Sequence, residues 1–315
     1  MTIERVMDFP QLPELASSQI SDDEFNLFRQ LIYRHAGIAL SRSKKALLEA
    51  RLTKRLRELG LKSFADYYEC VIHNGDGAEL IQLLDRVSTN ETHFFREPRQ
   101  FDFLEQQLFP LWTAQADAAM RARSIRVWSA GCSTGEEPYS LAMLLTDHFS
   151  PSAGWQVDIL ATDLSSRALN AAQNAAWPIA KANEIPPEYL KRFMLRGVGT
   201  QTGKMKAGPE IVSIVRFQRL NLNDDTYLIN GRFDAIFCRN VLIYFDTQSR
   251  RRAIERLLDY LAPGGFLFVG HAESLNGVTE RACHVAPTVY TRKDNDLWPS
   301  DKSRSGALET AKMIS

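Results

Sequence analysis

The sequence predicts an α/β fold, in which a mixed sheet carries a small antiparallel β insertion and follows a small helical domain. Apolar runs alternate with helical patterns between about residues 125 and 270. A stretch rich in proline and glycine, residues 178–216, interrupts that alternation. Two short apolar runs on either side of Pro287 then indicate an antiparallel hairpin at the end of the sheet.

Composition narrows the class of protein. The chain has 315 residues, is 44% hydrophobic and has a formal net charge of zero, so no bulk field draws it to nucleic acid or to a membrane. No apolar run approaches the roughly 20 residues that span a bilayer. The first 18 residues lack the basic and apolar segments of a signal peptide. We therefore expect a cytoplasmic protein.

The cysteines are few and far apart. The chain has four, and none of them forms a CxxC pair. This spacing argues against a zinc site and against a disulfide scaffold, and it favours a reducing compartment. We expect no metal.

The first 90 residues predict a flexible arm, 1–18, followed by an all-helical domain, 19–90. Ser21 and Glu24 have the spacing of a capping box at the start of the first helix. Three further helices are expected, over about 43–59, 63–74 and 78–88. In the second helix, one apolar stripe is expected to contain Leu48, Leu52, Leu56 and Leu59.

Beside that stripe lies a basic cluster, and it has two interpretations. Its members are Lys44, Arg51, Lys54 and Arg55. The cluster is either an ordinary solvated face or a docking face for an acidic partner, and a local excess is more informative in a chain that is neutral overall.

A linker and connecting helix are expected over residues 91–124. The linker runs from polar to aromatic to charged residues and reaches Pro98, which restricts the residue before it. A helical apolar face then follows, with Phe101, Leu104, Leu108 and Leu111.

The stretch 125–145 predicts a buried strand, a turn of small residues and a helix, which is the first half of a nucleotide-binding unit. Gly131 and Gly135 let the backbone bend and let a ligand approach it. Glu136 and Glu137 stand where a phosphate would otherwise meet the helix N-terminus. The acids favour a cationic ligand such as S-adenosylmethionine over NAD or ATP. A tight turn with acidic capping and no ligand is the alternative.

A second strand, over 157–163, ends in Asp163. An acid at this position of a doubly wound sheet accepts hydrogen bonds from ribose hydroxyls. Asp163 has a competing role as the cap of the helix expected over 165–176.

The insertion, 178–216, is expected to contain a helix over 188–193 and strand-like segments around 204–205 and 211–217. The sheet then resumes with a strand from Val215, a buried strand over 233–238, a helix over 247–261 and a strand over 266–270. From Asp294 onward a polar, disordered tail is expected.

Six stretches taken together resemble the CheR family, the S-adenosylmethionine-dependent methyltransferases that modify bacterial chemotaxis receptors. They are TNETHFFRE (89–97), SAGCSTGEEPYSLAM (129–143), ATD (161–163), RLNL (219–222), FDAIFCRNVLIYF (233–245) and GHAES (270–274). The resemblance covers about residues 20–293. It implies a Rossmann-like class I methyltransferase domain over 125–293. This domain follows the helical domain in the chain and contains the inserted β-subdomain.

The resemblance also implies a set of site residues. Glu136 would hold the ammonium of the cofactor's methionine part, and Asp163 would hold the ribose. Arg96 and Tyr244 would stand at the methyl transfer site. The remaining residues implied to bind cofactor or substrate are Asn90, Thr92, Ala130, Gly131, Asn221, Leu222, Arg239 and Asn240.

The activity so implied is the transfer of a methyl group from S-adenosylmethionine to glutamate side chains of methyl-accepting receptors, which gives methyl esters and S-adenosylhomocysteine. The partners would be the receptors' cytoplasmic helices, met by the basic cluster, and a receptor C-terminal pentapeptide bound by the β-subdomain. A monomer is expected, with no nucleic-acid partner and no membrane insertion.

The chemistry agrees with the absence of a Ser/His/Asp or Cys/His set. A glutamate carboxylate is already ionised at pH 7 and needs no general base; it needs alignment with the methyl donor. Arg96 and Tyr244 therefore receive orienting roles, and a structural ion pair for Arg96 and a core position for Tyr244 are the alternatives. Two other functions stay open: methylation of a small molecule or nucleic acid, and a non-catalytic cofactor-binding scaffold.

Overall fold

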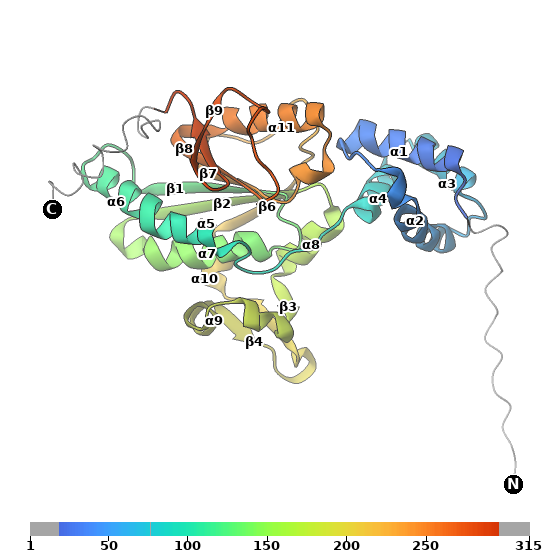
Figure 1. The fold of residues 1–315 in the computed structure, drawn as a ribbon. Coiled ribbons are helices and arrows are strands. Elements are labelled where there is room, and N and C mark those ends of the chain that lie inside the picture. The colour runs from blue at the N-terminus through green and yellow to red at the C-terminus, as the bar shows by residue number, and fades with distance from the viewer. Residues whose placement is uncertain (1–18, 76, 296–315) are drawn as a thin grey trace, which may run out of the picture. The chain divides into compact units, whose positions relative to one another are not determined.

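A computed structural model of the chain describes residues 19–75 and 77–295. The arm expected over residues 1–18 and the tail from residue 296 lie outside the described residues. The chain divides into two compact units (Figure 1). The helical unit takes the described part of residues 1–31 and 40–87, and the sheet unit takes residues 32–39 and the chain from residue 88.

The helical unit is built from four helices and a short 3-10 turn, Arg42–Lys44. The helices are α1 (Asp22–Ala36), α2 (Lys45–Leu59), α3 (Phe64–His73) and α4 (Ala78–Val87). The predicted capping box is confirmed: the Ser21 amide donates to Glu24 Oε2 at 2.8 Å, and the Glu24 amide donates to Ser21 Oγ at 3.2 Å. The last residues of α1 belong to the sheet unit.

The apolar stripe of α2 is three residues long rather than four. Leu48, Leu52 and Leu56 are buried, whereas Leu59 is 37% exposed. Leu59 is the last helical residue, and Gly60 follows it with a φ of +68° that ends the helix. The chain therefore turns away before Leu59 reaches the core.

The main sheet has seven strands in the order β6-β2-β1-β7-β8-β10-β9. The strands are β1 (Ser124–Ala130), β2 (Gln156–Asp163), β6 (Val215–Arg219), β7 (Phe233–Cys238), β8 (Leu261–Val269), β9 (Ala282–Ala286) and β10 (Val289–Arg292). The first five in this order are parallel, and β10 pairs antiparallel with β8 and with β9. The predicted mixed sheet with a terminal hairpin is confirmed.

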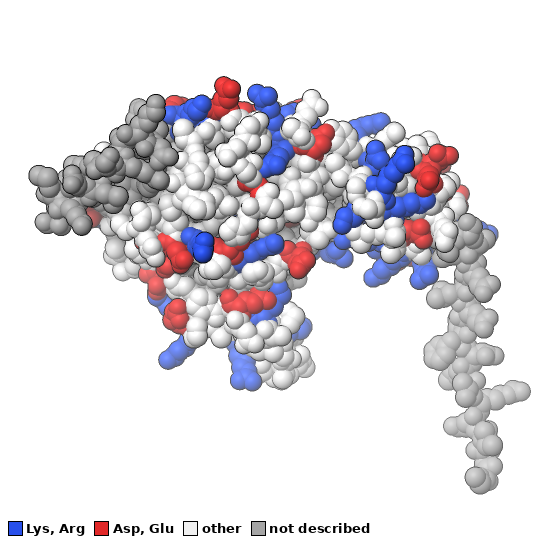
Figure 2. All heavy atoms as spheres, viewed as in Figure 1, with Lys and Arg blue, Asp and Glu red and all other residues white. Residues whose placement is uncertain are grey.

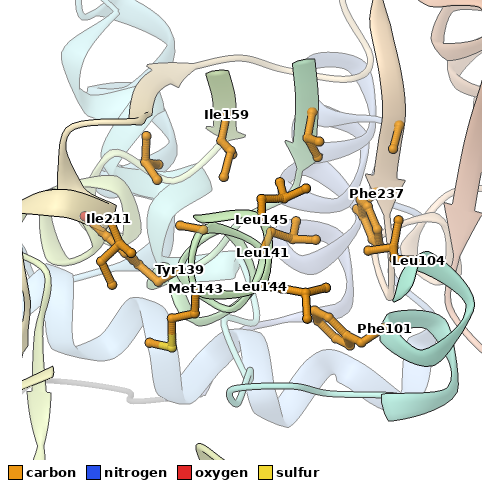
Figure 3. Packing of buried hydrophobic residues seen from close by; sticks show 14 of the residues in the cluster. Phe101, Leu104, Tyr139, Leu141, Met143, Leu144, Leu145, Ile159, Ile211 and Phe237 are labelled. Atoms are coloured by element: carbon orange, nitrogen blue, oxygen red, sulfur yellow. The ribbon is translucent and has the colours of Figure 1, made fainter. Parts of the chain in front are cut away.

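Two cores lie on the two faces of this sheet, because side chains of a strand alternate between faces. Ile125 and Val127 of β1 join a cluster with buried side chains of the helix after β1, and Trp128 and Ala130 join a second cluster with those of the helix before β8. Figure 3 shows Leu141 and Leu145 directed toward the strands in the first core.

The helices of the sheet unit follow from these cores. They are α5 (Pro98–Phe103), a π-helical turn (Leu104–Leu108), α6 (Phe109–Asp117), α7 (Glu136–His148), α8 (Ser166–Asn174), α9 (Pro187–Phe193), α10 (Pro209–Val212) and α11 (Thr247–Asp259). Short 3-10 turns are Pro151–Ala153, Ile179–Glu184, Gly199–Gln201 and Leu242–Tyr244. In Figure 1, α11 lies on the opposite face of the sheet from α5 and α7.

The insertion forms a separate three-stranded antiparallel sheet in the order β3-β5-β4. Its strands are β3 (Ala176–Pro178), β4 (Met194–Arg196) and β5 (Lys204–Ala207). The strand expected over 211–217 begins only at Val215, and it belongs to the main sheet as β6. The residues before it form α10 because Pro209 starts a helical turn that buries Ile211.

None of the helices in the described part of the chain is long and apolar enough to cross a membrane.

Candidate active site

The carboxyl ends of β1, β2 and β7 lie side by side at one edge of the main sheet. Ala130 pairs with Thr162, and Ser129 pairs with Phe237. The amides of Gly131 and Cys132 both donate to the Thr162 carbonyl, at 2.7 and 2.9 Å. The turn after β1 is therefore attached to the end of β2, at the edge where open parallel sheets bind ligands.

The glycine turn depends on the absence of side chains. Gly131 has a φ of +94°, and a Cβ there would lie 2.3 Å from Cγ2 of Val241. Gly135 has a φ of +98°, and a Cβ there would lie 3.0 Å from the Cβ of Ala172. Both glycines are required by close approach as well as by backbone conformation.

Asp163 lies at the end of β2 and holds the glycine turn. Its Oδ2 accepts from the Ser133 amide and its Oδ1 from the Ser165 amide, both at 2.8 Å. The cap of α8 is Ser165, whose hydroxyl accepts from the Ala168 amide at 3.2 Å. Asp163 therefore has two backbone partners without being the helix cap. Ser133 also donates from Oγ to the carbonyl of Asn90 at 3.0 Å, which attaches Asn90 to this turn.

Glu136 is 1% exposed at the start of α7 and is paired with Lys181. The Lys181 Nζ lies 2.7 Å from Oε1 of Glu136, and Oε2 accepts from Thr134 Oγ1 at 2.6 Å. The same Nζ donates to the carbonyl of Thr92 at 2.9 Å. Lys181 thus brings two of the expected cofactor residues, Thr92 and Glu136, to one ammonium.

Arg239 follows β7, is 6% exposed and lies between two acids. Its Nε is 3.4 Å from Glu137 Oε2 and 3.7 Å from Glu97 Oε2, and its Nη2 donates to the Arg96 carbonyl. Among the described residues its Nε and Nη1 have no hydrogen-bond acceptor. A buried guanidinium with unused donors fits a ligand carboxylate.

The surroundings of Glu137 have opposing effects on the pKa of its carboxyl. Burial raises the pKa of its carboxyl above the ordinary value, and the Arg239 guanidinium and the Ser129 hydroxyl work in the other direction. Ser129 Oγ donates to Glu137 Oε1 at 2.7 Å. The carboxylate stays within reach of Arg239 at a cost in desolvation.

The segment after Arg239 is held by Glu273. The Glu273 carboxylate accepts from the amides of Asn240 at 2.8 Å, Gly270 at 2.6 Å and Ile243 at 3.1 Å. Asn240 has a φ of +58°. Tyr244 ends the next 3-10 turn and is 36% exposed, so it is not a core residue.

Other expected site residues have contacts of their own. Arg96 donates from Nη1 to the carbonyl of Glu91 at 3.3 Å. Asn221 donates from Nδ2 to the carbonyl of His35 at 2.6 Å and to Asp224 at 2.9 Å, so its amide nitrogen is used within the protein. Leu222 is buried in the second core. The strand end that precedes them is attached to the site because the Leu220 amide donates to the Asp163 carbonyl at 3.0 Å.

The basic cluster of the helical unit is divided in its contacts. Lys44 and Lys54 are exposed. Arg55 instead pairs with Glu79 at 2.5 Å and with Glu58 at 3.1 Å, and Arg51 donates to the carbonyl of Val87. In Figure 2, acidic side chains lie among the basic ones on the visible face of this unit. Two of the four residues therefore contribute to the fold of their own unit.

Three residues of the site were missed from sequence: Lys181, Glu97 and Glu273. Glu273 lies in the stretch GHAES and Glu97 ends the stretch TNETHFFRE, so both were within recognised motifs without a role. Nothing near Lys181 in the sequence indicates a partner, because Glu136 is 45 residues away.

Comparison with known proteins matches both units to domains of one family. Residues 23–88 match the family described as CheR methyltransferase, all-alpha domain, and residues 90–291 match CheR methyltransferase, SAM binding domain. A chemotaxis protein methyltransferase of Borreliella burgdorferi is 36% identical over 87% of this chain and 95% of its own length. That of Escherichia coli is 37% identical over 86% and 91%, and chemotaxis protein methyltransferase 2 of Pseudomonas aeruginosa is 37% identical over 85% and 92%.

Proposed function

Because the chain belongs to the CheR methyltransferase family, it is an S-adenosylmethionine-dependent methyltransferase, and we propose that it acts at the edge formed by β1, β2 and β7. The acceptors are glutamate side chains of chemotaxis receptors, and the products are glutamate methyl esters and S-adenosylhomocysteine. The observation that carries the proposal is that two oppositely charged side chains, Glu136 and Arg239, are each buried at that edge of the family's SAM binding domain. They do not pair with each other: Glu136 contacts Lys181, and Arg239 contacts Glu97 and Glu137.

The donors and acceptors fit the cofactor. The buried Glu136 carboxylate suits the ammonium of the methionine part, and the unused donors of Arg239, with Asn240 beside it, suit its carboxylate. Asp163 binds the ribose. Ala130, at the end of β1, and Gly131, in the turn that follows, contact the ligand through their backbone. Asn221 and Leu222 lie at the adenine, although the Asn221 amide nitrogen and carbonyl already have partners within the protein. Asn90, Thr92 and Arg96 complete the site.

The protein's task in the reaction is alignment. The cofactor supplies a methyl group on a positively charged sulfur, and the acceptor carboxylate is ionised at pH 7 without help. Arg96 and Tyr244 hold that carboxylate in line. Their hold has to be moderate, because the negative charge disappears during transfer and a strong clamp would stabilise the reactant state.

Receptor contact is assigned to both the helical unit and the insertion. The exposed Lys44 and Lys54 meet acidic methylation helices, and the half-buried Arg51 and Arg55 belong to the same cluster. In the insertion, β4 is an edge strand with one unpaired side, which suits addition of an extended C-terminal pentapeptide. We expect the enzyme to work as a monomer in the cytoplasm.

A transfer assay with radiolabelled S-adenosylmethionine tests the proposal. Receptor membranes are supplied with and without the receptors' C-terminal ends, and base-labile label is counted because carboxyl methyl esters hydrolyse readily in alkali. Base-labile label on the receptor is the expected result. Label that resists alkali, or label only on added nucleic acid, would contradict the acceptor class. Equal transfer to both receptor forms would contradict the pentapeptide assignment alone.

A further inference from the structure

Lys181 gives Glu136 a cation from outside the main sheet. The lysine lies on the 3-10 turn Ile179–Glu184 of the insertion, whereas Glu136 starts α7. The side chain of Glu136 is 1% exposed and that of Lys181 is 28% exposed. A cationic partner stabilises a carboxylate this deeply buried, because an unpaired buried charge is strongly destabilising.

The same turn also holds the linker at two points. Lys181 Nζ donates to the Thr92 carbonyl at 2.9 Å, and Glu184 Oε2 accepts from the Phe94 amide at 2.9 Å. One of the two attachments therefore uses the ammonium that neutralises Glu136. A change in the partner of Glu136 would therefore also change the contact between the linker and the insertion.

Lysine carries a primary ammonium, the same group that S-adenosylmethionine carries on its amino-acid part. Two ammonium groups at hydrogen-bond distance from one carboxylate repel each other, and the repulsion is large where water is scarce. Glu136 has one further oxygen, Oε2, and Thr134 already donates to it. The two cations therefore compete for this carboxylate.

We propose that Lys181 is an internal counterion of Glu136 that the cofactor's ammonium replaces, so that cofactor binding releases the Ile179–Glu184 turn from Thr92. The inference rests on the proposed function, since it takes Glu136 as the ammonium ligand. It assigns to the insertion a direct link with cofactor occupancy, through a residue that touches the same carboxylate.

The consequence is that Lys181 weakens cofactor binding. Lys181→Met removes the competitor and is expected to bind S-adenosylhomocysteine about tenfold more tightly. Lys181→Arg keeps the charge and is expected to bind like the wild type. The ligand 5′-deoxy-5′-methylthioadenosine lacks the amino-acid part, so its affinity should be the same in all three proteins.

The test is titration calorimetry of both ligands with the full chain. Lys191→Met is the matched control, because it removes an exposed lysine of the same insertion, and it should leave both affinities unchanged. Glu136→Gln removes the contested charge, so adding Lys181→Met to it should bring no further gain. Unchanged or weaker S-adenosylhomocysteine binding by Lys181→Met, or equal changes for the two ligands, would overturn the inference.

Failure of the proposed cofactor placement would look different. If Glu136→Gln, folded by circular dichroism, binds S-adenosylhomocysteine as tightly as the wild type, Glu136 does not hold the ammonium. If Glu136→Gln weakens that binding and Lys181→Met does not tighten it, the placement stands and the counterion inference alone is wrong.

Discussion

The guanidinium of Arg239 donates from Nη2 to the backbone carbonyl of Arg96. This bond joins the end of β7 to the segment before α5, across 143 residues of sequence. Because the acceptor is a backbone atom, the side chain of Arg96 is not committed by it. The contact therefore fixes the backbone position of Arg96 without using its guanidinium.

The first prediction concerns the orienting side chains. Arg96→Ala and Tyr244→Phe should each lower the rate of methyl transfer about 10- to 100-fold, because each removes a group that aligns the acceptor. The affinity for S-adenosylhomocysteine should stay largely intact. Single-turnover transfer and calorimetry measure the two quantities, and normal turnover in both variants would refute the assigned roles.

The second prediction concerns pH. Burial raises the pKa of the Glu137 carboxyl above its ordinary value of 4.5, although Arg239 opposes this. A raised pKa in the folded state means that the folded protein binds this proton more tightly than the unfolded chain does. The stabilisation is fully present below the unfolded-state pKa and is lost as pH rises through the folded-state pKa.

Glu137→Gln does not titrate, so it isolates this effect. The free energy of unfolding of the wild type minus that of Glu137→Gln should decrease as pH rises above 4.5. Urea unfolding from pH 4 to 8 measures the difference, and groups common to both proteins cancel. A difference that grows with pH would show that Arg239 outweighs desolvation.

The third prediction concerns the turn after β1. Gly131→Ala should lower the free energy of unfolding by about 2–4 kcal/mol, because it adds strain at a positive φ and a clash with Val241. Gly277→Ala is the matched control, since Gly277 has a φ of +74° and nothing within 4 Å of the position of a Cβ. Its cost should be the strain alone.

Adding Val241→Ala to Gly131→Ala should recover part of the loss, because it removes the methyl group that the new Cβ meets. Thermal and urea unfolding measure the free energy of unfolding of the wild type, of Gly131→Ala, of Gly277→Ala and of the double variant. Equal losses in Gly131→Ala and Gly277→Ala would mean that the turn relaxes and that its approach to Val241 is not required.

The fourth prediction concerns receptor contact. The double variant Lys44→Glu and Lys54→Glu should raise the KM for receptor about tenfold and leave cofactor affinity unchanged, because both lysines are exposed and far from any expected cofactor contact in sequence. The difference in receptor KM between the wild type and this double variant should decrease at high salt. Arg51 and Arg55 are unsuitable for this test, since their bonds within the helical unit confound docking with stability.

The control for docking is a second double reversal, Arg251→Glu and Lys293→Glu, on exposed positions of the sheet unit outside the insertion. It changes the net charge by the same amount. An equal rise in receptor KM in both double variants would indicate a general charge effect. An unchanged KM in the first would show that the helical face is merely solvated.

Local pattern was sufficient for most helices and strands and for the glycine turn at the edge of the sheet where we propose the site. Strand periodicity, the glycine turn of 131–135 and the capping box at Ser21 act over a few residues, so their outcome is readable from sequence. The boundaries that failed lie where two local signals compete. Leu59 continues the apolar stripe yet precedes a helix-ending glycine, and Ile211 has strand character yet follows a helix-starting proline.

What the sequence by itself determined is therefore the α/β fold, the resemblance to its family and the residue types gathered at one sheet edge. Only the tertiary structure decided the partners: Lys181 on Glu136, Arg239 between Glu97 and Glu137, and Arg55 on Glu79. The physical reason is that a charge buried on folding takes whichever opposite charge the topology brings near. That choice depends on residues distant in the chain, and no local pattern records it.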